Sequence, residues 1–162
     1  MDGSQNYFSL CVYCGSSSDV ADVYQDAARN VGQFCADNQI KLVYGGGRTG
    51  LMGIAADAAL EAGGVVEGVI PTFLKEKEVA HSGLHKLYTT ETMHERQQKM
   101  FDLSDAFLML PGGLGSLAEF FEMLTWRQLD LHTKPIYVLN TEGYWTKLFS
   151  TIEGLKEKGF IR

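Results

Sequence analysis

The stretch "LMLPGGLGSLAEFFEML" (residues 108–124) changes character within a few positions, and this change decides the fold. An apolar run ends at Pro111, glycines follow at 112, 113 and 115, and a helix-like apolar pattern then resumes. A buried strand that passes through glycines into a helix is typical of parallel α/β sheets. One carboxylate, Glu119, lies where the second run begins, so it either caps this helix or acts on a ligand that the glycines hold.

The rest of the chain repeats this alternation of strand and helix. Short apolar, β-branched runs predict buried strands at 7–14, 40–45, 65–70, 106–110 and 135–140. Helical patterns lie between them at 20–36, 51–62, 92–104, 114–131 and 144–158, with Asp19 as the predicted N-cap of the first. We therefore expect a three-layer α/β fold, in which helices cover both faces of a parallel sheet. Because there is no linker or internal repeat, residues 1–162 are predicted to form a single domain.

Composition excludes several classes of partner. The 162 residues carry a formal net charge of -6 and no cluster of lysine or arginine, which argues against a nucleic acid polymer as partner. The first residues have no basic region typical of a secretory signal, and no apolar run approaches the roughly 18 residues needed to span a bilayer. Three cysteines, an odd number, do not suggest a disulfide framework. We expect a cytoplasmic protein with reduced thiols and no membrane partner.

Three predicted strand ends carry unusual residues, and ligands of such sheets bind at strand ends where the strand order reverses. These ends read "CGSSSD" (14–19), "GGGRTGLMG" (45–53) and "PGGLGS" (111–116). In the last two, a helix start after glycines offers unpaired N–H groups and a positive dipole end to an anion. Tight turns without a ligand are the alternative, but two such loops in one sheet favour a ligand that carries phosphate. The stretch 71–88 has no clear periodicity and is predicted to be a loop near the site.

The patterns around Glu119 and Arg96 each leave two interpretations open. If Ser116 is an N-cap, "SLAE" (116–119) is a capping box and Glu119 reaches back to the Ser116 N–H. If the helix begins near Leu114, Glu119 lies in the second turn and faces the ligand. Arg96 shares a helix face with Met93 and Met100. It either extends from the edge of the core to solvent or meets an anion or an electron-rich base.

Other candidate motifs are weaker. Cys11 and Cys14 have C-x-x-C spacing, but Cys11 lies inside a predicted strand, which disfavours a redox role. His81 and His85 have no further ligand nearby, so we expect no metal site. There is no G-x-S-x-G motif for a serine hydrolase.

Five motifs together resemble one family: "VYCGSS", "YGGGRTGLMG", "MHERQQKM", "PGGLGSLAEF" and "TWRQLDLH". They resemble the Lonely Guy (LOG) family of cytokinin riboside 5'-monophosphate phosphoribohydrolases, often labelled "possible lysine decarboxylase". The resemblance covers nearly the whole chain. It implies an enzyme that hydrolyses the N-glycosidic bond of an adenine-type nucleoside 5'-monophosphate, without a metal or organic cofactor, to free base and ribose 5-phosphate. It also implies a Rossmann-like fold and a homodimer with the site near its interface.

The resemblance also implies roles for individual residues. Arg96 and Glu119 match the two catalytic positions. The phosphate-binding turn of the family matches Gly112, Gly113, Gly115 and Ser116. The rest of the pocket matches Gly15, Ser16, Gly45, Gly46 and Gly47, and Met93 matches the position beside the base.

The sequence departs from the family pattern at four places. Ser116 replaces the usual threonine, Gln97 stands where lysine often follows the arginine, and Asp130 replaces a glycine. The last two put substrate preference and interface geometry in question. The chain ends at "GFIR", where relatives continue, so we expect that a C-terminal strand and helix are absent from this sheet.

Two alternatives to this enzyme remain. The first is a protein that binds a nucleotide or a phosphorylated cofactor without catalysis. The second is the decarboxylase label, which normally requires pyridoxal phosphate on a lysine. None of the three strand-end loops contains a lysine, which argues against it.

Overall fold

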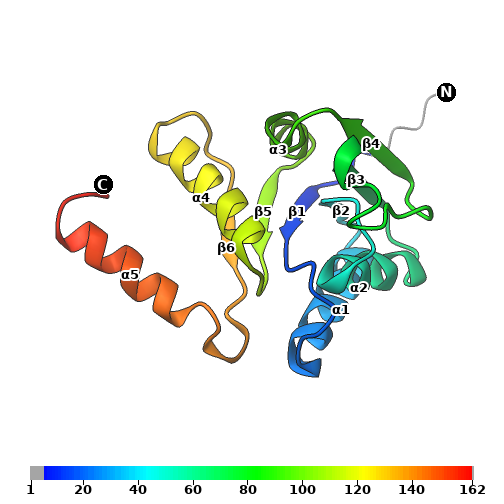
Figure 1. Ribbon diagram of the computed structural model, residues 1–162, viewed down its shortest axis with the longest axis horizontal. Helices are drawn as coiled ribbons and strands as arrows, with labels where there is room; N and C mark the ends of the chain where they lie inside the picture. The colour runs from blue at the N-terminus through cyan, green and yellow to red at the C-terminus, as the bar shows by residue number, and fades with distance from the viewer. Residues whose placement is uncertain (1–5, 162) are drawn as a thin grey trace.

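One parallel sheet organises residues 6–161, the part of the chain that the computed structural model describes. Its strands are β1 (Ser9–Tyr13), β2 (Lys41–Tyr44), β3 (Val66–Pro71), β4 (Lys86–Thr90), β5 (Ala106–Met109) and β6 (Ile136–Val138). They lie in the order β4-β3-β2-β1-β5-β6, and every neighbouring pair is parallel (Figure 1). The predicted fold class is confirmed.

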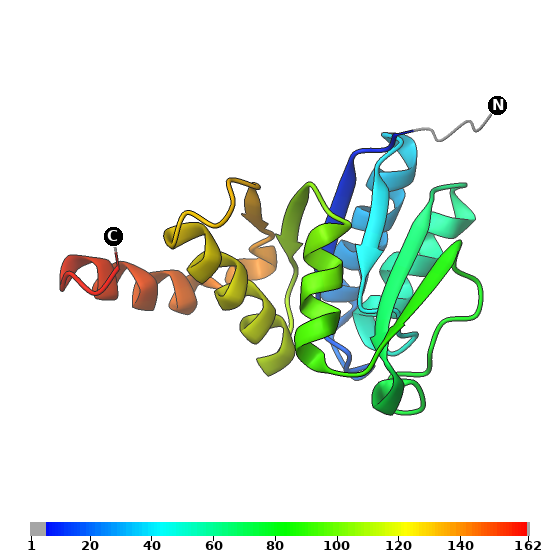
Figure 2. The same cartoon turned by 90° about the horizontal axis from the view of Figure 1, so that it is seen from above.

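Helices cover both faces of the sheet. They are α1 (Asp22–Asp37), α2 (Gly50–Glu61), α3 (Met93–Asp102), α4 (Leu114–Gln128) and α5 (Thr146–Glu157), with short 3-10 turns at Thr72–Leu74 and Thr141–Gly143. Figures 1 and 2 show α1 and α2 on one face, α3 and α4 on the other, and α5 at the β6 end of the molecule. No helix between residues 6 and 161 is long and apolar enough to cross a membrane.

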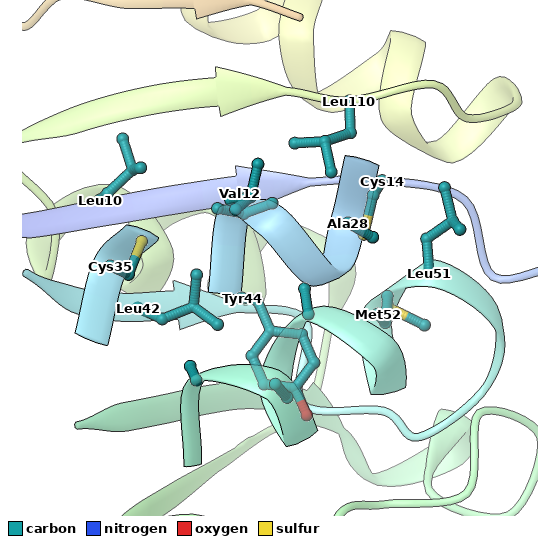
Figure 3. Packing of buried hydrophobic residues seen from close by; sticks show 14 of the residues in the cluster. Leu10, Val12, Cys14, Ala28, Cys35, Leu42, Tyr44, Leu51, Met52 and Leu110 are labelled. Carbon is teal, nitrogen blue, oxygen red and sulfur yellow. The ribbon is translucent and has the colours of Figure 1, made fainter. Parts of the chain in front are cut away.

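Alternation along the central strand β1 produces two separate cores. Leu10, Val12 and Cys14 point to the face that α1 and α2 cover, where they pack with Leu42 and Leu110 (Figure 3). The next set of side chains, Cys11 and Tyr13, points to the opposite face, where Phe107, Met109 and Met123 lie. Because β1 is buried on both faces, an uninterrupted apolar run was the correct sign of a central parallel strand.

Two local expectations were wrong or incomplete. The edge strand β4, "KLYTT", was not predicted, because a half-exposed edge strand needs no continuous apolar run. Helix α1 begins at Asp22 with Ala21 as its N-cap and no side-chain cap, so the N-cap predicted at Asp19 is wrong. Asp22 itself lies in the first turn, where a carboxylate interacts favourably with the helix dipole.

The order of the strands reverses beside β1. Strands β2, β3 and β4 extend from one side of β1, and α3 then leads the chain back to β5 on the other side. At the carboxyl ends of β1 and β5, the Gly15 N–H donates to the Pro111 carbonyl at 3.1 Å. A Cβ on Gly15 would lie 3.3 Å from the Gly112 Cα, so the two loops leave little room for side chains. This contact fixes the point at which a ligand can enter.

Gly32 tests how closely α1 and α2 must pack. A Cβ at Gly32 would lie 2.2 Å from the Ala55 carbonyl oxygen, so we expect Gly32→Ala to lower the free energy of unfolding by about 1–3 kcal/mol. Gly154→Ala in α5 is the matched control, because a Cβ there meets nothing within 4 Å. Gly154→Ala should leave the free energy of unfolding unchanged or raise it slightly. Denaturant unfolding of both variants measures this, and equal effects would contradict it.

Candidate active site

A cavity of about 490 Å³ opens at the carboxyl ends of β1 and β5, where the strand order reverses. Its lining includes ten of the twelve residues that the sequence nominated: Gly15, Ser16, Gly45, Met93, Arg96, Gly112, Gly113, Gly115, Ser116 and Glu119. It also includes Glu78, which the sequence did not single out. The structure thus brings residues from five separate segments to one place.

Gly46 and Gly47 do not line this cavity. Gly46 has φ of +75°, and its carbonyl accepts the His81 N–H at 2.9 Å. A Cβ on Gly47 would lie 2.8 Å from the Glu78 carbonyl oxygen, and the Gly47 carbonyl accepts the Tyr44 hydroxyl. These two glycines allow the β2–α2 loop to pack against the segment that carries Glu78, rather than allowing a ligand to approach.

The start of α4 presents unpaired backbone amides to the cavity. Helix α4 begins at Leu114 with Gly113 as N-cap and no side-chain cap, so the capping-box interpretation of Ser116 is wrong. By helix geometry the amides of Leu114, Gly115 and Ser116 have no partner within the helix. A Cβ on Gly113 or Gly115 would meet nothing within 4 Å, so the space in front of these amides is open. Backbone N–H groups and the dipole favour a negative group there.

The start of α2 is closed, although its loop has a similar sequence. Here the Gly50 N–H donates to the Ser18 hydroxyl at 3.3 Å, and the Leu51 N–H donates to the Gly15 carbonyl at 3.0 Å. The amides of Gly50 and Leu51, which the sequence predicted to be free for an anion, are therefore hydrogen-bonded within the protein. Leu51 and Met52 at the start of α2 also line the cavity, but the first two amides of α2 already have acceptors within the protein.

Arg96 is buried in the wall of the cavity and held by three acceptors. Its Nε donates to the Val69 carbonyl at 3.0 Å, and its Nη2 donates to the Gly45 carbonyl at 2.6 Å and to Glu78 Oε2 at 3.0 Å. Only 4% of Arg96 is exposed, so it does not extend to bulk solvent. A Cβ on Gly45 would lie 2.2 Å from Nη2, so glycine is required where the arginine crosses this loop.

Glu119 lies in the second turn of α4 and is half-buried at the cavity. Burial raises the pKa of Glu119 to about 7; the Arg96 guanidinium opposes this rise, and the charges of Glu78 and Glu122 add to it. The Glu119 carbonyl accepts from the Gln97 amide at 3.3 Å. Gln97 is buried, so a residue that departs from the family pattern fixes the backbone of Glu119.

The remaining polar candidates have structural partners. Burial is the main reason why the pKa values of Cys11 and Cys14 are raised well above their usual range, so neither thiol is a reactive thiolate. His81 Nδ1 accepts the Gly83 N–H, so its Nε2 donates to Asp57 at 2.7 Å. His85 accepts the Val66 N–H. Within residues 6–161, no group of three His, Cys, Asp or Glu side chains is placed to hold a metal ion.

Fold and cavity together define a Rossmann-like α/β protein with a cavity where its strand order reverses. Residues 52–162 match the family model described as "possible lysine decarboxylase". The chain is 46% identical over 154 residues to the cytokinin riboside 5'-monophosphate phosphoribohydrolase of Rhodococcoides fascians, covering 94% of this chain and 78% of that protein. The chain is 42% identical to cytokinin riboside 5'-monophosphate phosphoribohydrolase LOG5 of Arabidopsis thaliana, and the match covers 94% of this chain and 67% of that protein. The chain belongs to the LOG family.

A solved structure shares the fold at lower sequence similarity. The Moco carrier protein from Chlamydomonas reinhardtii superposes with a TM-score of 0.72 at 23% identity, covering 92% of this chain and 86% of that one. At this identity the match concerns the fold alone.

Replacing Glu119 tests its raised pKa. A carboxyl whose pKa is raised on folding, here from 4.5 to about 7, costs stability as the pH rises through that interval. We therefore expect the free energy of unfolding of Glu119→Gln to exceed that of wild type by about 1–3 kcal/mol at pH 8. Denaturant unfolding measures this difference. The difference should disappear below pH 4.5. The exposed Glu153→Gln is the control, and a pH-independent difference between Glu119→Gln and wild type would contradict the assignment.

Proposed function

We propose that this protein hydrolyses the N-glycosidic bond of an adenine-type nucleoside 5'-monophosphate, cytokinin riboside 5'-monophosphate or AMP, to free base and ribose 5-phosphate. The observation that carries the proposal is the arrangement of one cavity. It holds an open helix start, a buried arginine and a carboxyl whose pKa is raised to about 7. Membership of the LOG family supports the same reaction, because the relatives named above are phosphoribohydrolases of this kind.

The 5'-phosphate binds at the start of α4 in this proposal. The amides of Leu114, Gly115 and Ser116 donate to its oxygens, and the Ser116 side chain lies on the same turn. Gly15 and Ser16 form the facing wall. A chain with net charge of -6 can bind a phosphate in this way because backbone N–H groups, rather than lysine side chains, donate hydrogen bonds to the anion. Binding energy from the phosphate then contributes to catalysis at the distant glycosidic bond.

In this proposal Glu119 and Arg96 stabilise the two opposite charges that develop during the reaction. Cleavage passes through an oxocarbenium-like state, with positive charge on the sugar and negative charge on the leaving base. The Glu119 carboxylate stabilises the first charge and takes a proton from the attacking water, a task for which a pKa near 7 is suited. Arg96 stabilises the second charge or fixes the substrate's orientation. Met93, exposed at the cavity, lies beside the base.

We also propose the setting in which this site works. Residues 1–162 act as a single nucleotide-binding domain, since the described strands form one sheet around one site. The protein works in the cytoplasm. Its three cysteines support this location, because all are buried free thiols.

Ribose 5-phosphate release from AMP and from isopentenyladenosine monophosphate tests the reaction. We expect wild type to be active, the corresponding nucleosides without phosphate to react poorly, and Glu119→Gln to lose activity by about 10²–10⁴-fold. Arg96→Lys should also lose activity, because an ammonium cannot reproduce the three-acceptor geometry of the guanidinium. Circular dichroism checks folding, and the exposed Glu153→Gln is the matched control. A folded wild type that binds AMP but releases no ribose 5-phosphate would instead be a nucleotide-binding protein.

A homodimer with its interface near the cavity is a further part of the proposal. Leu114 and Phe121 lie seven residues apart on one face of α4 and are 86% and 38% exposed, and Leu114 lines the cavity. We expect sedimentation equilibrium to give twice the chain mass of 17.9 kDa. Phe121→Glu should lower this mass to that of one chain, whereas Phe34→Glu, an exposed apolar residue of α1, should not. A monomeric wild type would contradict the homodimer.

A further inference from the structure

Glu78 is the acidic side chain that directly contacts Arg96. Its Oε2 accepts from Arg96 Nη2 at 3.0 Å, and the two side chains are 19% and 5% exposed. Glu78 comes from the segment between β3 and β4 that has no clear periodicity, so its sequence context gives no sign of a role. An ion pair with so little exposure is screened only weakly by solvent.

The hydrogen bonds of Arg96 show what this contact adds. A guanidinium carries five donors. Two of them, on Nε and Nη2, meet the neutral carbonyls of Val69 and Gly45, and the second Nη2 donor meets Glu78. Neither Nη1 donor is bonded to another described residue, and Arg96 lines the cavity. Among residues 6–161, only Glu78 supplies this buried guanidinium with a negative charge in direct contact, and a buried charge without one is costly.

Glu119 is the other carboxylate that acts on Arg96. It interacts electrostatically with Arg96 across the cavity, and no hydrogen bond or ion pair joins the two among the described residues. Without Glu78, the positive charge of Arg96 would have Glu119 as its remaining partner in the cavity. A direct pair of Arg96 and Glu119 would occupy the two groups that the substrate needs.

The backbone around Glu78 is fixed from several directions. The Glu78 N–H donates to the Leu74 carbonyl and the Glu78 carbonyl accepts the Arg48 N–H, both at 2.9 Å. The His81–Asp57 hydrogen bond then ties the same segment to α2. The carboxylate is therefore presented to Arg96 by a rigid segment, which is the requirement for orienting another side chain.

We infer that Glu78 is a positioning residue for Arg96: it holds the guanidinium apart from Glu119, so that both groups stay free to act on the substrate. This role rests on the proposed function, and it explains why the cavity contains one cation and two carboxylates. It also gives the β2–α2 glycine loop a function. Gly45 receives the arginine, and Gly47 admits the backbone of Glu78.

The pH dependence of activity separates this role from a merely structural one. The groups that act on Glu119 are Arg96 from α3, Glu78 from the segment before β4 and Glu122 from α4. Glu119 also interacts electrostatically with Cys11 and Tyr13 of β1 and with Cys14 directly after β1. Loss of the Glu78 charge removes one group that raises the pKa of Glu119 and lets Arg96 move closer. Both changes lower that pKa, so the acid limb of the activity profile should move to lower pH.

The experiment compares Glu78→Gln, Glu78→Asp and the exposed Glu76→Gln with wild type. Ribose 5-phosphate release from AMP is measured between about pH 5 and 9, the range that brackets an ordinary and a raised carboxyl pKa. We expect Glu78→Gln to lose kcat on the order of 10- to 100-fold with little change in KM and an acid limb at lower pH. Glu78→Asp keeps the charge and should recover part of kcat, and Glu76→Gln should match wild type.

Three results would overturn the inference. The first is wild-type kcat in Glu78→Gln. The second is a loss of kcat with the acid limb unmoved, which would indicate a structural role; if Glu78→Gln does not fold, Glu78→Ala, which also removes the charge, is judged by the same limb. The third is a crystal structure of Glu78→Gln in which Arg96 keeps its place, because we expect the guanidinium to turn toward Glu119. This last test needs no activity, so an inactive wild type would count against the proposed reaction and leave the positioning role to be decided by the structure.

Discussion

The close contact between the ends of β1 and β5 is the constraint on which the rest of the site depends. The Gly15 N–H donates to the Pro111 carbonyl, while the Gly15 carbonyl accepts the first amide of α2 that follows Gly50. One residue thus joins both glycine loops. Because Gly15 and Gly112 approach so closely, the starts of α2 and α4 meet at the point where the strand order reverses. This contact closes the first helix start and leaves the second facing the cavity.

The site places charge where folding alone would not favour it. Arg96 is almost fully buried, and it relies on two backbone carbonyls and one carboxylate. Glu119 is held where its ionised form is disfavoured, which reduces stability at neutral pH and above. Such perturbed groups are typical of functional sites. The surrounding apolar layers, anchored on both faces of β1, provide the stability that tolerates them.

The β2–α2 loop shows how one sequence pattern can serve two purposes. Both glycine-rich loops pass from a buried strand into a helix, and both look like anion sites in the sequence. In the loop before α2 the amides are taken by Ser18 and Gly15, and its glycines make room for Arg96 and the Glu78 segment. In the loop before α4, Gly112 packs against Ser116 and Gly15, whereas a Cβ on Gly113 would meet nothing within 4 Å. The difference lies in what packs against each loop, which local sequence does not encode.

The sequence by itself determined the parallel sheet and the layers of helices, because apolar runs and glycine turns act through local geometry. Its resemblance to the LOG family supplied the twelve predicted site residues, and ten of them line the cavity. It missed the edge strand β4, since an edge strand needs no continuous apolar pattern. Only the tertiary structure decided the partner of Arg96, the burial that raises the pKa of Glu119, and the place of Gly46 and Gly47 behind the cavity. These depend on contacts between segments far apart in the chain, such as Glu78 with Arg96 and Gly45 with Arg96. Hydrogen bonding and burial are properties of that three-dimensional neighbourhood, so no stretch of sequence states them.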